Sequence, residues 1–67
     1  MELDLFALKI YMADKKYDRH LLAQKANLSE STINAYFQKR INPSLLSLGN
    51  IADALDVDVS KIVKHSE

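Results

Sequence analysis

Apolar residues recur at helical spacing along most of the 67 residues. At 100° per residue they predict helices at about 3–14, 19–26, 30–39 and 45–55, followed by a short last helix at about 59–64. Residues that favour helix N-caps precede four of these segments: Asp18, Ser29, Ser44 and Asp58. The pattern therefore predicts an all-α fold of five helices.

The first predicted helix carries apolar residues on two nearly opposite sides. One stripe consists of Leu5, Leu8 and Met12, and the other consists of Leu3, Phe6 and Ile10. The second stripe needs a cover, which is either the last helix of the same chain or a second protomer. The pattern alone leaves both explanations open.

Residues 18–40 are predicted to form two short helices joined by a tight turn. Asn27 stands at the reversal, and asparagine tolerates a left-handed backbone better than other non-glycine residues. Ala23 marks the place where the helices cross, because close contact leaves no room for a larger side chain. Apolar residues fall where two such helices would meet: Leu22, Ala26, Leu28, Ile33 and Tyr36.

The segment DRHLLAQKANLSESTINAYFQKR, residues 18–40, resembles the helix-turn-helix of the lambda-repressor and Cro type, also called the xenobiotic-response-element family. The later segment NPSLLSLGNIADALDV resembles the next helix of that family, so the resemblance covers roughly residues 8–63. It implies one DNA-binding domain over residues 1–67, with the five-helix lambda-repressor-like fold and the helix-turn-helix at about 19–39. In that register Leu8, Tyr11 and Met12 face the core.

The chain departs from the family pattern at two pairs of positions. Asn27 and Asp56 stand where the family usually has glycine, and we expect both to adopt a left-handed backbone. Met12 and Phe37 stand where relatives often carry a buried Arg–Glu ion pair. An apolar contact is expected to replace the pair, and such a replacement is often neutral or stabilising.

The resemblance also implies which side chains meet DNA bases. The first, second and sixth positions of the recognition helix usually reach base edges, and here they are Glu30, Ser31 and Ala35. Glu30 can accept from the N4 amino group of cytosine, or it can simply stabilise the first helical turn. Ala35 can offer a methyl group to thymine. Thr32 and Asn34 add exposed polar groups, and Asn34 can pair with adenine through two hydrogen bonds.

Contacts with the DNA backbone are expected on either side of the recognition helix. Arg19 occupies the first position of the preceding helix, which relatives commonly use to bind phosphate. Lys39, Arg40 and Asn42 lie in the loop that the family places along the phosphates. Tyr36 and Phe37 are expected in the core rather than stacked on bases.

Charge is unevenly distributed although the formal net charge is zero. Residues 15–42 contain six basic and two acidic side chains, a net charge of +4, and the rest of the chain contains three basic and seven acidic side chains, a net charge of −4. A basic segment that coincides with the motif favours a nucleic-acid partner.

Catalysis, cofactors and metals find little support in the sequence. There is no cysteine, so no disulfide and no cysteine-based metal site can form, and the two histidines, His20 and His65, have no second ligand at helical spacing. No phosphate-binding loop or nucleophile motif is present. We therefore predict that the protein is not an enzyme and binds no cofactor, metal or small-molecule ligand. We also predict that it does not enter membranes. It is expected to be a cytoplasmic protein, encoded by a bacterium or phage, that associates with the nucleoid when bound to DNA.

We predict a small transcriptional regulator, most simply a Cro-like repressor or an isolated DNA-binding domain, since no effector-sensing domain is recognised in these residues. The expected working form is a homodimer on a palindromic operator in double-stranded DNA. Two surfaces are candidates for pairing: the stripe of Leu3, Phe6 and Ile10, and the apolar end around Val57, Val59 and Ile62. The alternative function is a protein-interaction module, such as an antitoxin, that uses the same fold.

Overall fold

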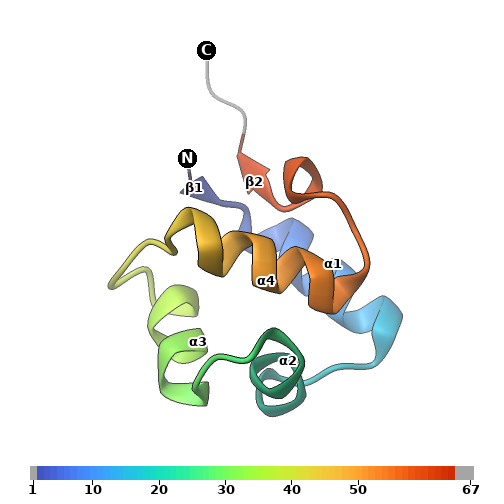
Figure 1. The fold of residues 1–67 in the computed structure, drawn as a ribbon, viewed down its shortest axis with the longest axis horizontal. Coiled ribbons are helices and arrows are strands. Elements are labelled where there is room, and N and C mark those ends of the chain that lie inside the picture. The colour runs from blue at the N-terminus through green and yellow to red at the C-terminus, as the bar shows by residue number, and fades with distance from the viewer. Residues whose placement is uncertain (1, 65–67) are drawn as a thin grey trace.

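Four α-helices make up most of residues 2–64, which are the residues described by the computed structural model. They are α1 (Leu5–Lys15), α2 (Arg19–Ala26), α3 (Glu30–Phe37) and α4 (Leu45–Leu55). In Figure 1, α4 crosses the middle of the molecule, α1 lies behind it, and α2 and α3 lie below it. α2 packs against both α4 and α3, so the helix-turn-helix rests on α4.

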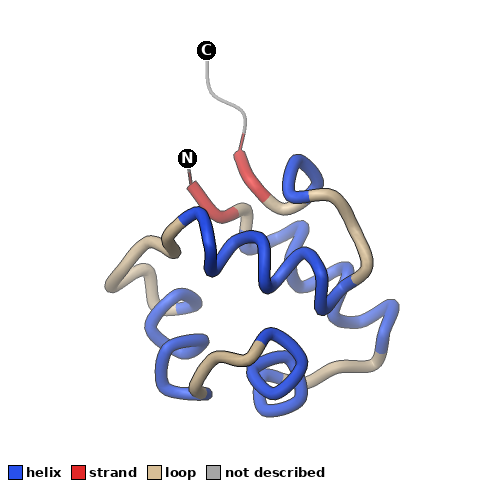
Figure 2. Tube along the Cα trace, viewed as in Figure 1, coloured by secondary structure: helices blue, strands red, loops and turns tan. Residues whose placement is uncertain are grey.

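The predicted fifth helix is wrong. The chain makes a single 3-10 turn, η1 (Val59–Lys61), and then enters a short strand, β2 (Val63–Lys64), which pairs antiparallel with β1 (Glu2–Leu3). Figure 2 shows the two strands together at one end of the molecule. Asp58 makes no side-chain capping bond to η1, and β-branched residues suit the extended backbone that follows. Residues 65–67, predicted to fray, lie outside the described residues.

The strand pair also changes where the first helix begins. Glu2 and Leu3 belong to β1, and the backbone N–H of Asp4 donates to the carbonyl of Ile62 at 2.8 Å. Asp4 then caps α1, because its carboxylate accepts from the backbone N–H of Ala7 at 3.1 Å. The helix therefore starts at Leu5 rather than at Leu3.

Side-chain caps start the other helices where the sequence predicts them. The Asp18 carboxylate accepts from the N–H of Leu21 at 2.8 Å, and the Ser29 and Ser44 hydroxyls accept from Thr32 at 3.1 Å and Ser47 at 3.2 Å. Each bond satisfies an N–H that has no partner within its own helix. Three of the four predicted caps are thus confirmed.

The core lies between α4 and the other elements. Its most deeply buried large side chains are Leu8, Leu22, Ile33, Leu48, Ile51, Leu55 and Ile62. The helical spacing of apolar residues predicts that Leu45 shares the buried face of α4. This prediction is wrong, since Leu45, the first residue of the helix, is 72% exposed. Ile62 is fully buried, so in the second predicted pairing surface only Val57 and Val59 keep part of their surface exposed.

The second stripe of α1 divides between two environments. Leu3 is buried at the strand pair, opposite Val63, so the C-terminal segment of the same chain covers it. Phe6 and Ile10 remain 75% and 45% exposed. The cover is a strand and not the predicted helix, and it reaches only part of the stripe.

None of the helices within residues 2–64 combines the length and the apolar character that crossing a bilayer requires.

Candidate nucleic-acid interface

Small side chains and a left-handed residue set the crossing of α2 and α3. Ala23 and Ala26 are buried on α2, and Ile33 is buried on α3. Asn27 has φ 59°, as predicted, and its N–H donates to the carbonyl of Gln24, which ends α2. Ser29 then starts α3 only two residues later, so the chain turns sharply between two helices of eight residues each.

The first turn of α3 presents polar groups to solvent. Glu30 and Ser31 are exposed, and Thr32 is half-buried. The Thr32 hydroxyl lies 2.7 Å from the Ser29 hydroxyl, so it takes part in the cap of the helix. Glu30, Thr32 and Asn34 each make a polar side-chain contact within the described residues, whereas the Ser31 hydroxyl makes none.

Two polar pairs join the start of α2 to α3. His20 Nδ1 lies 3.2 Å from Glu30 Oε1, and Arg19 Nη1 donates to Asn34 Oδ1 at 2.9 Å. The sequence assigned Arg19 to phosphate and Asn34 to a base, and the structure brings the two side chains together. The His20–Glu30 pair was not predicted, because neither residue signals the other without the crossing geometry.

Phe37 packs against the core cluster that contains Met12, and its ring also contacts cations. The Arg19 guanidinium carbon lies 4.3 Å from the centroid of the Phe37 ring, and Lys9 Nζ lies 6.0 Å from it. Met12 is buried in the core, whereas Phe37 is half-buried at its edge. The position that carries one half of an ion pair in relatives therefore binds cations here through its ring.

Ala35 is the predicted site residue with the least access to DNA. It is buried, with 6% of its surface exposed, which leaves its methyl group little area to offer a thymine. Its carbonyl accepts from the N–H of Arg40 at 3.0 Å, in the turn that closes α3. Burial thus weighs against a base contact by Ala35.

The loop after α3 keeps its predicted cations exposed. α3 ends at Phe37 rather than at Lys39, because Lys39 adopts a left-handed backbone with φ 58°. Lys39, Arg40 and Asn42 are all exposed, and Pro43 is buried next to them. Lys39 and Arg40, with Arg19 and Lys25 on α2, give the helix-turn-helix four exposed cationic side chains.

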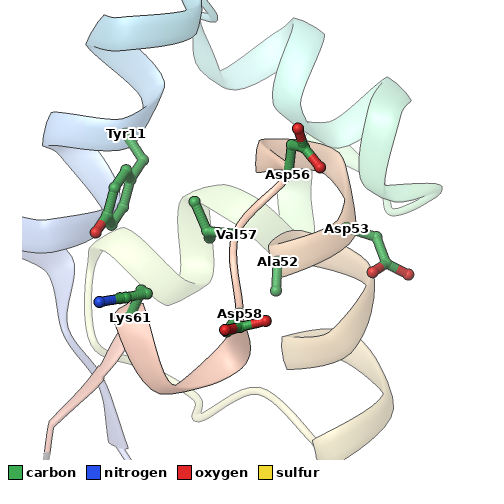
Figure 3. A pocket seen from close by; sticks show the side chains of 7 residues that line it. All are labelled: Tyr11, Ala52, Asp53, Asp56, Val57, Asp58 and Lys61. Atoms are coloured by element: carbon green, nitrogen blue, oxygen red, sulfur yellow. The ribbon is translucent and has the colours of Figure 1, made fainter.

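A pocket of about 480 Å³ lies elsewhere, between α1, the end of α4 and η1. Figure 3 shows its lining, in which three carboxylates accompany Tyr11, Ala52, Val57 and Lys61. The carboxylates belong to Asp53, Asp56 and Asp58. Within residues 2–64 no three acidic or histidine side chains are grouped in a way that could hold a metal ion. An acidic pocket repels phosphate, so the candidate interface with DNA is the α2–α3 side.

Comparisons with known proteins agree with this geometry. The sequence model of a family described as helix-turn-helix, HTH_3, matches residues 8–62. The chain is 41% identical over 56 residues to the immunity repressor protein of Bacillus phage phi105. The match covers 84% of this chain and 39% of that repressor.

Two solved structures share the fold over the whole chain. Both are of PhpD, one with cadmium atoms and one with cadmium complexed with hydroethylphosphonate. Each gives a TM-score of 0.82 at 22% identity, and the match covers 14% of the PhpD chain. At that identity the likeness concerns the fold alone.

Proposed function

The chain belongs to the lambda-repressor-like helix-turn-helix family, and from that premise we propose that it binds double-stranded operator DNA as a transcriptional repressor. The observation that carries the proposal is the α2–α3 side of the molecule, where polar side chains at the start of α3 are flanked by exposed cations. In this arrangement α3 enters the major groove, and the flanking residues bind phosphates. The protein acts by binding, and its site of action is the nucleoid in the bacterial cytoplasm.

The residues divide into two groups by what they contact. Glu30 and Ser31 are exposed at the start of α3, which suits base readout, with Thr32 at their edge. Arg19, Lys39, Arg40 and Asn42 contact the DNA backbone and set the register of the protein on the duplex. Similarity to a phage repressor supports repression rather than activation. The match spans 39% of the length of that repressor.

We further propose that the working form is a homodimer on a palindromic site. One recognition helix of eight residues, with few exposed polar side chains, distinguishes only a few base pairs. A two-fold dimer doubles this readout and places the half-sites about 34 Å apart, one turn of the double helix. The net charge of zero imposes no strong repulsion between protomers.

Salt dependence of duplex binding tests the proposal. Affinity should fall steeply with salt, and Arg40→Ala should weaken binding to all sequences and reduce the log–log slope by about 0.9, because one phosphate contact is lost. Lys61→Ala is the matched control, since it removes a cation from the acidic pocket, and it should leave affinity and slope unchanged. Weak binding with no salt dependence would instead favour a protein-interaction module.

A further inference from the structure

Arg19 is held in place by two side chains of α3. Its Nη1 donates to Asn34 Oδ1 at 2.9 Å, and its guanidinium carbon lies 4.3 Å from the centroid of the Phe37 ring. The 4.3 Å distance is well within the range of a cation–π contact, whereas Lys9, at 6.0 Å, lies at the outer limit. The two contacts come from one helix, so they fix the guanidinium relative to the helix proposed to enter the groove.

This arrangement leaves most of the N–H donors of Arg19 free to bind an anion. A guanidinium carries five N–H donors, and among the described residues only Asn34 accepts from one of them. The guanidinium carbon lies over the Phe37 ring, and the ring offers no oxygen or nitrogen acceptor. Arg19 is nevertheless exposed, so an oxygen-rich anion can reach the free edge.

The same contact limits what Asn34 can do. Recognition of adenine by asparagine uses both ends of the amide, with Oδ1 accepting from N6 and Nδ2 donating to N7. Here Oδ1 already accepts from a charged donor, and the side chain is half-buried. Turning it toward a base would give up the bond to Arg19.

We propose that Asn34 and Phe37 are positioning residues that hold Arg19 against a phosphate of the DNA backbone, and that Asn34 does not read a base. The proposal rests on the proposed function and revises one residue role within it. Because the long arginine side chain is ordered before DNA arrives, less conformational freedom is lost on binding. The benefit is the same for every sequence, since phosphates carry no sequence information.

The test measures affinity for an operator and a scrambled duplex over a range of salt. Asn34→Ala and Phe37→Leu should each weaken binding equally on both duplexes. For Phe37→Leu the loss should be about two- to fivefold, the size expected for an exposed cation–π contact. Their salt slopes should equal that of the wild type, because the charge of Arg19 remains. Arg19→Ala should instead lower the slope by about 0.9.

Double-mutant cycles separate positioning from a general structural role. In the Arg19→Ala background, Asn34→Ala and Phe37→Leu should have no further effect on affinity. With Arg19 present, Phe37→Tyr should keep wild-type binding, because it keeps the ring. All measurements are made well below the melting temperature of each variant. If Phe37→Leu costs the same with or without Arg19, its role is structural and the proposal fails.

Two other results would also overturn the proposal. A base preference that relaxes at one operator position in Asn34→Ala would assign that residue to readout. Coupling of Phe37 to Lys9 rather than to Arg19 would assign the ring to the other cation. Absence of salt-dependent duplex binding by the wild type would reject the proposed function itself, which is a separate outcome.

Discussion

The surroundings of Gly49 show whether this position needs a glycine. It lies inside α4, where glycine costs about 1 kcal/mol relative to alanine. A close helix contact would justify that cost, but a Cβ built at Gly49 meets nothing within 4 Å. Its backbone also avoids positive φ. The position therefore has no steric need for glycine.

Gly49→Ala should for this reason stabilise the protein by about 0.5–1 kcal/mol, through helix propensity and a less flexible unfolded chain. Urea unfolding measures the change, and the m-value should stay constant. Gly49→Pro serves as the opposite control and should destabilise strongly, because proline breaks the hydrogen bonding of a helix interior. A destabilised alanine variant would reveal a close contact at this position.

Left-handed residues show how far single positions can be predicted. Asn27 and Asp56 adopt φ 59°, as their side chains and the family pattern predict. Lys16 and Lys39 adopt φ 60° and φ 58°, and neither was predicted. Unlike Asn and Asp, lysine has no short polar side chain that favours a left-handed backbone. The sequence therefore predicts that α3 ends at Lys39, two residues beyond its end in the structure. The backbone there is set by the packing around the turn.

At the scale of elements, the crossing of α2 and α3 carries the candidate interface. Ala23 is 3% exposed on α2, and α2 packs against α3. A larger side chain at a buried position of α2 can disturb its packing against both α3 and α4, because α2 packs against both helices.

Ala23→Leu should therefore overpack the crossing and cost about 1–3 kcal/mol of stability. Gln24→Leu is the matched control, since Gln24 is exposed on the same helix, and it should change stability by less than about 0.5 kcal/mol. Thermal melting of the two variants beside the wild type checks this prediction. Equal melting temperatures for all three would indicate that the helices do not pack closely at Ala23.

The helix-turn-helix and α4 could be predicted from sequence because each has a cap at its start and a periodic apolar face. The C-terminal segment could not, because Val59, Ile62 and Val63 suit either a short helix or a strand. Pairing with Leu3, 60 residues away along the chain, decides between them. The contacts of Arg19 with Asn34 and Phe37 could not be predicted either, because they depend on how two helices cross.

For the whole molecule, the exposed apolar side chains constrain how two copies can pair. Burial of Leu3 and Ile62 removes members of both surfaces predicted from sequence. Ile41, Leu45 and Leu46 are exposed instead, in the loop after α3 and the first turn of α4. These side chains follow α3 directly along the chain, so we propose that two copies pair through them, with half-sites one helical turn apart.

Leu46→Glu should consequently uncouple the two half-sites, because it places a charge in the pairing surface, and it should leave the fold intact since Leu46 is 75% exposed. Phe6→Glu, at an equally exposed residue of α1, is the matched control and should leave cooperative binding unchanged. Footprinting combined with sedimentation checks both variants. Loss of cooperativity only in Phe6→Glu would place the interface on α1.

The central claim is that the first turn of α3 reads duplex DNA, and selection of bound sequences from a random duplex library tests it most directly. The wild type should enrich a two-fold symmetric site with half-site centres about 34 Å apart. Glu30→Ala and Ser31→Ala should each relax the preference at one position of each half-site. Failure to enrich any sequence, or enrichment of an unchanged site by both variants, would contradict the claim.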